Sequence, residues 1–140
     1  MAGQTLGLVK AYRIENSTGV AKFACVVQGA ADGNCKLPTA QGVAGFVGVT
    51  TEAQPNQYKG VAVAKNGIFD VIAGGTITRG DRLAINSVAG DVYSVEAAIN
   101  AAPGTAAVFH IVGIAEMSAV AGDQFPMFIT VGAQVNVAVS

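Results

Sequence analysis

The sequence predicts an all-β fold, a compact β-barrel or β-sandwich-like domain with at most one short helix and an extended N-terminal arm. Residues 66–93 give the clearest indication, because three short apolar segments follow one another there across glycine-centred turns. Hydrophobic residues make up 51% of the 140-residue chain and charged residues 12%, whereas an ordinary soluble domain carries about 25% charged residues. The apolar runs are only a few residues long, far short of the roughly 20 that a membrane-spanning helix needs, so they fit short strands.

The individual strands follow from apolar or alternating runs that are bounded by Gly, Pro, Asn and Asp. They are expected at residues 21–27, 35–37, 45–51, 58–64, 68–72, 83–85, 92–95, 106–115, 125–131 and 134–139. Residues 95–102 form the one segment with a helical composition, because they are rich in alanine and are followed by Pro103-Gly104. The length fits a single β domain over residues 13–140.

Residues 1–12 are expected to form the arm. Two glycines interrupt this stretch, and the residues between and after them have a modest β propensity with an apolar edge. Chain ends of this kind are ordered only when something holds them down. Two interpretations stay open: an arm that adds to the sheet of a neighbouring chain, and a frayed tail or plain first strand.

The charge pattern excludes several partners. The formal net charge is −1, and the eight basic residues are scattered between Lys10 and Arg82. Without a basic cluster to neutralise a run of phosphates, no nucleic-acid partner is expected. All the charged residues that follow Arg82 are acidic, which disfavours binding to an anionic membrane surface. Because so few charged residues are available to cover the surface of a monomer, we expect other subunits to cover part of it. The alternative is a monomer that is simply rich in Ala and Gly.

Two cysteines, Cys25 and Cys35, flank a turn at Asp32-Gly33-Asn34 and are placed to face each other across a hairpin. The N-terminus lacks the basic and apolar pattern of a secretory signal. Two reduced, buried thiols are therefore expected, with a disulfide as the alternative. A metal site is not expected, because the chain has a single histidine.

The sequence suggests two similar halves, at about residues 13–67 and 68–132. The segment Val47–Val49 resembles Val112–Ile114, which lies 65 positions later, and each is followed by an acidic loop and a longer strand. Two β-rich halves of this size would bury their apolar faces against one another.

No catalytic, metal or cofactor-binding residues are predicted. His110 lies inside an apolar run without a nucleophile or carboxylate at an informative spacing, so it is interpreted as a core or interface residue. Asp70, Asp81, Asp91 and Asp123 each adjoin a turn, where an aspartate side chain bonds the nearby backbone. These carboxylates are therefore interpreted as turn residues.

Two further short motifs have a structural interpretation. The tripeptide Arg79–Asp81 mediates adhesion in some extracellular proteins, but the chain lacks a secretory signal and Gly-Asp is a common turn. The pair Gly74-Gly75 lies between strands, with no helix after it to present amides to a phosphate. Neither motif is expected to bind a ligand.

Four short motifs follow one another in the second part of the chain: Gly67–Val71, Ile77–Leu83, Ala89–Val92 and Val112–Ala115. They read as a strand G-x-F-x-V, a G-D-x-L turn, a glycine-centred hairpin and a V-G-x-A strand. In this order they resemble the small capsid decoration (cement, or head-stabilising) proteins of tailed bacteriophages, which have β-tulip-like domains. The turn signature of that resemblance consists of Gly67, Gly80, Asp81, Gly90 and Asp91.

The resemblance implies a homotrimer on the capsid exterior that stabilises the head by bridging subunits of the major capsid protein. It implies a protein that is made in the host cytoplasm, becomes part of the virion, and has no catalytic activity and no cofactor. It also implies an extended terminal arm, at either end of the chain, that pairs with capsid strands. The residues expected to make that contact are Thr5, Leu6, Leu8, Val9 and Tyr12.

A second class of function stays open, a ligand- or carbohydrate-binding β module of a phage tail or a cell-surface assembly. Such a module would need exposed aromatic residues at its loop tips, whereas the chain has no Trp and three Tyr. A β-rich enzyme is disfavoured by the missing catalytic set, and a pilus subunit by the missing secretory signal.

Overall fold

In the part of the chain that the structure describes, the protein is nearly all-β with one short helix, as the sequence predicts. The computed structural model describes residues 5–101 and 106–137, with side chains described for residues 7–101 and 108–130. The strands are β1 Thr5–Leu6, β2 Val9–Ile14, β3 Cys25–Gln28, β4 Asn34–Lys36, β5 Phe46–Thr50, β6 Gly60–Ala64, β7 Gly67–Ile72, β8 Arg82–Ile85, β9 Val92–Ser94, β10 Ala106–Ala115 and β11 Gln124–Val137, and the helix α1 is Val95–Ala101.

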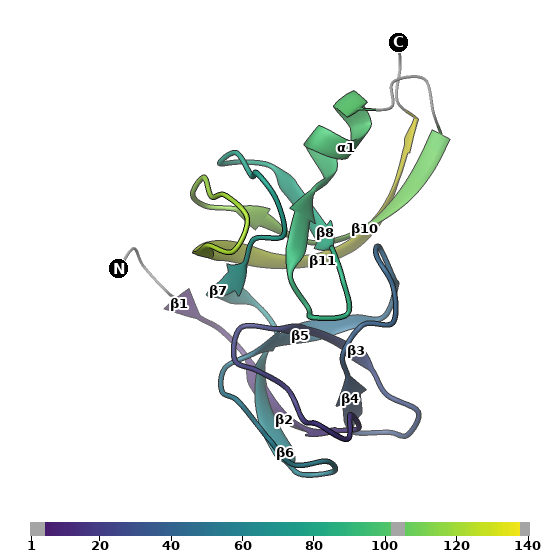
Figure 1. Ribbon diagram of the computed structural model, residues 1–140, viewed down its shortest axis with the longest axis vertical. Coiled ribbons are helices and arrows are strands. Elements are labelled where there is room, and N and C mark those ends of the chain that lie inside the picture. The colour runs from purple at the N-terminus through teal and green to yellow at the C-terminus, as the bar shows by residue number, and fades with distance from the viewer. Residues whose placement is uncertain (1–4, 102–105, 138–140) are drawn as a thin grey trace.

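The described strands form two units that meet at the Asn66-Gly67 turn (Figure 1). The order β2-β4-β3-β5-β6 closes into a barrel, which lies at the bottom of Figure 1, and the order β1-β7-β11-β10-β8-β9 makes a six-stranded sheet. Gly67 at the turn has a φ of 89°, a conformation that glycine adopts without strain. The barrel therefore comes from the first half of the chain, and the sheet comes from the second half together with β1.

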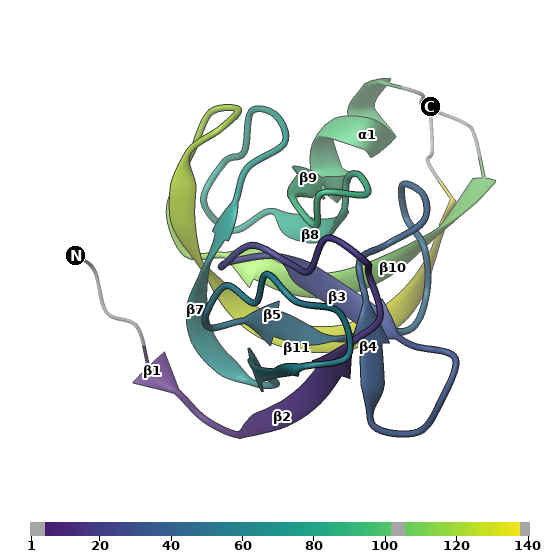
Figure 2. The ribbon, with the colours of Figure 1, turned by 60° about the horizontal axis from the view of Figure 1, so that its bottom comes forward.

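One long two-stranded ribbon crosses both units. β2 pairs with β6, with Val9 opposite Ala64, and β1 pairs with β7, with Thr5 opposite Ile68. Paired residue numbers add to the same total in both ladders, so the two ladders share one register. Figure 2 shows β1 and β2 as one continuing segment that passes from the sheet to the barrel. Residues 9–12, which the sequence assigns to an arm, are therefore a barrel strand in this structure, because β6 satisfies their backbone groups.

The barrel and the sheet use the same scheme of strand pairing. The antiparallel order β2-β6-β5-β3-β4 in the barrel corresponds to β7-β11-β10-β8-β9 in the sheet. Each unit also has one parallel contact between its first and last strands, where Ile14 pairs with Cys35 and Ala73 pairs with Val92. That contact is a two-residue ladder in the barrel and a single bridge in the sheet. The sheet therefore stays open where the barrel closes.

Long-range backbone hydrogen bonds repeat between the units as well. Corresponding amide-to-carbonyl bonds are Ile14→Lys59 and Ala73→Asp123, Tyr58→Ile14 and Gly122→Ala73, and Phe23→Thr50 and Gly80→Ala115. The offset between corresponding residues changes along the chain, from 57 for Phe23 and Gly80 to 65 for Thr50 and Ala115. A single ungapped offset of 65 therefore describes only part of the correspondence.

Buried apolar side chains form three clusters. The interior of the barrel is filled by β-branched residues such as Val26 of β3. The next residue on β3, Val27, points to the other side and joins the largest cluster, which includes Phe69 and Met127 of the sheet. A third cluster, around Ile111, lies between the sheet and α1. Since burial of each such side chain contributes about 1.5–3 kcal/mol, the largest cluster holds the two units together.

Two details differ from the sequence prediction. β11 is one unbroken strand where two strands were expected, because Gly132 continues the ladder opposite Ile111 of β10. The consecutive strands β7 and β8 are not neighbours, since β11 and β10 lie between them. The Gly80-Asp81 turn therefore lies in a loop that connects two strands that are not paired, whereas β8 and β9 do pair directly.

Candidate assembly surfaces

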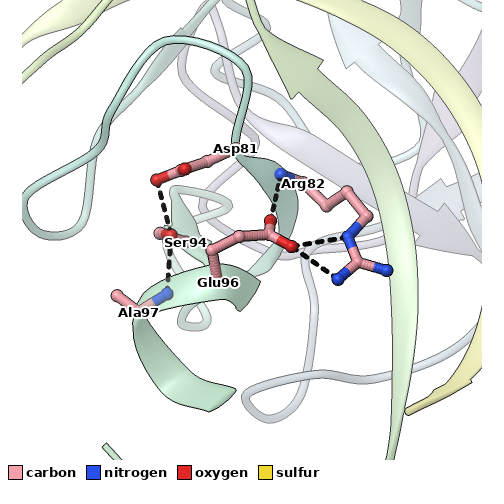
Figure 3. Close-up of polar contacts among 5 residues, drawn as sticks. All are labelled: Asp81, Arg82, Ser94, Glu96 and Ala97. Atoms are coloured by element: carbon pink, nitrogen blue, oxygen red, sulfur yellow. Dashed lines mark hydrogen bonds and ion pairs between the residues drawn. The ribbon is translucent and has the colours of Figure 1, made fainter. Parts of the chain in front are cut away.

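Asp81 connects the loop before β8 to the start of the helix (Figure 3). Its carboxylate accepts hydrogen bonds from the amide of Thr78 at 2.9 Å and from the hydroxyl of Ser94 at 2.7 Å. The Oγ atom of Ser94 in turn accepts a hydrogen bond from the amide of Ala97 at 3.0 Å, which is the geometry of a helix N-cap. Asp81 therefore orients the residue that begins α1.

Arg82 of β8 and Glu96 of α1 attach the helix to the sheet. The carboxylate of Glu96 accepts hydrogen bonds from the amide of Arg82 at 2.6 Å and from its Nε atom at 2.7 Å, and Nη2 completes the ion pair. The two side chains are 30% and 35% exposed, so solvent limits the ion pair to about 1 kcal/mol. The residues in Figure 3 are joined by hydrogen bonds and an ion pair, and these contacts position α1.

The rest of the turn signature also has a structural role. Gly80 and Gly90 have φ angles of 92° and 82°, so each occupies a position that favours glycine. Asp91 accepts hydrogen bonds from the Ser87 hydroxyl at 2.6 Å and from the Asn86 side-chain amide at 3.1 Å. The signature therefore describes loop geometry, and its carboxylates are engaged within the loops.

The five residues expected to contact a capsid lie in three environments. Thr5 and Leu6 form β1 and pair with β7. Leu8 and Val9 are 56% and 41% exposed, which places two apolar side chains at the surface where β2 begins. Tyr12 is half-buried against the barrel core. Among the members of the set whose side chains the structure describes, Leu8 and Val9 are thus the ones that offer an apolar surface to a partner.

Two lysines and a pocket lie beside Tyr12. The Nζ atom of Lys65 donates hydrogen bonds to the Tyr12 hydroxyl at 2.6 Å and to the Val47 carbonyl at 3.0 Å. The ammonium groups of Lys65 and Lys10 lie 4.9 and 5.2 Å from the centre of the tyrosine ring, within the range of a cation–π interaction. The pocket has a volume of about 310 Å³ and is also lined by residues 28–34. The two lysines beside Tyr12 suit an acidic group on a partner surface.

The two halves of the chain carry opposite charge. Residues 1–66 contain six basic and three acidic side chains, a formal charge of +3. Residues 67–140 contain two basic and six acidic side chains, a formal charge of −4. The barrel end therefore favours an acidic partner, and the sheet end repels one.

An apolar strip crosses the outer face of the sheet. It consists of Phe128 on β11, which is 43% exposed, and of the residues opposite it, Ile68 on β7 and Ile114 on β10. This outer strip is not among the features that the sequence predicts. The sequence does contain a signal for it, because residues 125–129 are apolar at every position. A strand that is apolar on both faces usually has both faces covered.

The two cysteines are free thiols in separate clusters, Cys25 between the units and Cys35 inside the barrel. Burial raises the pKa of the Cys35 thiol to about 11. Burial, with the nearby charge of Asp91, also raises the pKa of the Cys25 thiol. Both residues are therefore unreactive core thiols at neutral pH, as the sequence predicts.

His110 is half-buried on β10, in the ladder opposite Ala133. Within residues 5–101 and 106–137, the structure contains no group of three or more His, Cys, Asp and Glu side chains that is able to hold a metal ion. None of the helices that the structure describes is long and apolar enough to cross a membrane.

Comparisons with known proteins identify the fold. No family model matches the chain, and no curated protein matches it. The structure is similar to the crystal structure of the N base of the head fiber protein gp8.5 of bacteriophage phi29, with a TM-score of 0.61 and 17% sequence identity. The similarity covers 88% of this chain and 93% of that chain. The architecture of both units is therefore one that is found in the base of a phage head fiber.

Proposed function

We propose that this protein is a structural component of a tailed-phage virion. It forms a homotrimer on the capsid exterior and stabilises the head by bridging subunits of the major capsid protein. This is the role of the β-tulip-like decoration proteins that its motifs resemble. The protein acts through its surfaces, without catalysis, a cofactor or a nucleic-acid partner.

The observation that carries the proposal is the structural similarity to the phi29 head fiber base. It spans nearly the whole of both chains, so it concerns the complete two-unit architecture and not one common hairpin. The resemblance in motif order supports the same class of protein from separate information, because it depends on the sequence between Gly67 and Ala115 and not on the three-dimensional arrangement.

The barrel end is the surface that we assign to the capsid. It combines the exposed side chains of Leu8 and Val9, where β2 begins, with the two lysines beside Tyr12, Lys10 and Lys65, and it carries the positive half of the charge. An apolar centre with a charged rim is the usual composition of a protein interface. Thr5 and Leu6 lie at the end of the same strand segment and extend this contact along the sheet edge.

Co-sedimentation with purified capsids tests the proposal. The wild-type protein is expected to bind capsids that are assembled from the major capsid protein of the same genome. A Leu8→Glu/Val9→Glu variant is expected to bind at least about tenfold more weakly, because two exposed apolar contacts are lost and two like charges meet an acidic partner.

The matched control is Val88→Glu, because Val88 is 58% exposed in a turn of the other half of the chain. That variant should bind as the wild type does. A second variant that lacks residues 1–6 loses β1 but keeps every barrel strand, so it measures the contribution of the N-terminal segment alone. Failure of the wild-type protein to bind any such capsid would contradict the proposed function.

A further inference from the structure

β10 and β11 are longer than the barrel strands to which they correspond. β5 and β6 contain five residues each, whereas β10 contains ten and β11 contains fourteen. The additional length pairs residues 106–111 with residues 132–137, and we call this pair the terminal ribbon. Figure 1 shows that the terminal ribbon rises beside α1 and points away from the barrel.

Other strands of the sheet stop before the terminal ribbon. β8 pairs with β10 only at Gly113 and Ile114, and β7 pairs with β11 only as far as Ile129. In the part of the chain that the structure describes, neither outer edge of the terminal ribbon meets another strand. An isolated two-stranded ribbon is marginally stable in water and leaves a row of backbone groups without strand partners.

The helix covers one face of the terminal ribbon only. Phe109 and Ile111 pack in the cluster beneath α1 with Val95 and Ile99. Val108 precedes Phe109, so strand alternation places it on the opposite face, and it is 56% exposed. That opposite face and the two strand edges are available to a partner.

The terminal ribbon lacks the usual protection of a strand edge. Proteins protect exposed edges with charged residues or proline, which disfavour pairing with another chain. Residues 106–111 and 132–137 contain no Asp, Glu, Lys, Arg or Pro. Their composition therefore favours strand addition.

We propose that the terminal ribbon is the surface through which copies of this chain associate, each ribbon packing its edge and its Val108 face against a neighbouring copy. A cyclic assembly brings identical residues close together near its symmetry axis, so a charge placed there would oppose its own copies. An uncharged ribbon meets that requirement. The positively charged barrel end, by contrast, suits an acidic capsid surface. The inference rests on the proposed assembly role and specifies the self-contact within it.

Charged substitutions at Val108 test the inference by sedimentation velocity and light scattering. The wild-type protein is expected to be an oligomer, and Val108→Lys and Val108→Asp are each expected to weaken its association at least about tenfold, since like charges then face one another. A one-to-one mixture of the two variants is expected to recover association in part, because a mixed trimer has more pairs of opposite charge than of like charge. Val108→Ser, which adds no charge, is expected to weaken association by a smaller factor.

Val88→Lys and Val120→Lys are the controls, because these valines are 58% and 57% exposed in turns away from the terminal ribbon. Both should associate as the wild type does, and circular dichroism verifies that every variant is folded. A Val108→Lys protein that associates normally overturns the inference, as does a wild-type protein that is monomeric at every concentration. Capsid co-sedimentation of the same samples then reports separately on the proposed function.

Discussion

The barrel and the sheet place corresponding residues in opposite environments. Val49 of β5 pairs with Ala64 of β6, and the corresponding pair in the sheet is Ile114 of β10 with Phe128 of β11. Val49 and Ala64 are fully buried in the cluster between the two units. Ile114 is half-buried and Phe128 is 43% exposed. The same face is thus buried inside the molecule in one unit and remains at the surface in the other.

The helix accounts for part of this difference. Val27 of the barrel corresponds to Ala84 of the sheet, and Ala84 is buried beneath α1 with Val95. The barrel has no helix at the corresponding place, because β4 is followed by loop residues up to β5. The same pairing scheme thus produces one closed unit and one open unit, and in the open unit the helix covers part of one face while the outer strip remains at the surface.

The largest expected effect comes from a charge at the two corresponding positions Val49 and Ile114. Val49→Asp buries a carboxylate without a partner and should cost more than about 4 kcal/mol, enough to prevent folding. Ile114→Asp places the same group at a half-exposed position and should cost about 1 kcal/mol. Urea unfolding of the two variants measures the difference. Equal losses would contradict the assignment of buried and exposed faces.

The sequence predicted the fold class and most strands because both depend on local information. Short alternating runs and glycine turns are visible in residues 66–93, and β8, β9 and α1 lie where local patterns place them. The turn-signature glycines were recognisable for the same reason, since a positive φ is a local requirement.

The order of the strands was not visible, because it depends on contacts between distant residues. Nothing near Val9 in sequence indicates that it pairs with Ala64, and the interruption at Gly7 makes β1 and β2 look like a loose arm. The outer strip at Phe128 was missed for a related reason. Whether an apolar residue faces the core or the surface depends on the register of β11 with its neighbours, and a shift of one residue exchanges the two faces.

A smaller effect is expected at the glycines Gly48 and Gly113, which occupy corresponding positions opposite β6 and β11. A Cβ atom on Gly48 would lie 2.3 Å from the Ala64 carbonyl oxygen, and the φ of Gly48 is 152°. A Cβ atom on Gly113 would lie 2.4 Å from Cγ of Met127 and 2.6 Å from the Phe128 carbonyl oxygen.

Alanine is therefore expected to destabilise both units through overpacking, by about 2 kcal/mol at Gly113 and about 3 kcal/mol at Gly48, where backbone strain is added. Thermal unfolding of the two single variants provides the comparison. A tolerated alanine at either position would show that the two strands are farther apart there than the structure places them.

The smallest effect concerns a residue with a positive φ in the loop between β5 and β6 and its counterpart in the loop between β10 and β11. Tyr58 in the barrel has a φ of 60°, and its counterpart in the sheet is Gly122, with a φ of 90°. Tyr58→Gly should stabilise the protein by about 0.5 kcal/mol, because relief of strain exceeds the added flexibility of the unfolded chain. Gly122→Ala should destabilise it by about 1 kcal/mol through backbone strain alone, since no atom lies within 4 Å of the new Cβ.

Gly75→Ala is the matched control, because Gly75 has equal space and no positive φ, so the substitution should be neutral or slightly stabilising. Opposite signs at Tyr58 and Gly122 would confirm that the two loops share one backbone conformation and that only the sheet has a residue suited to it. A loss of stability in Tyr58→Gly would mean that the contacts of the tyrosine ring outweigh the strain.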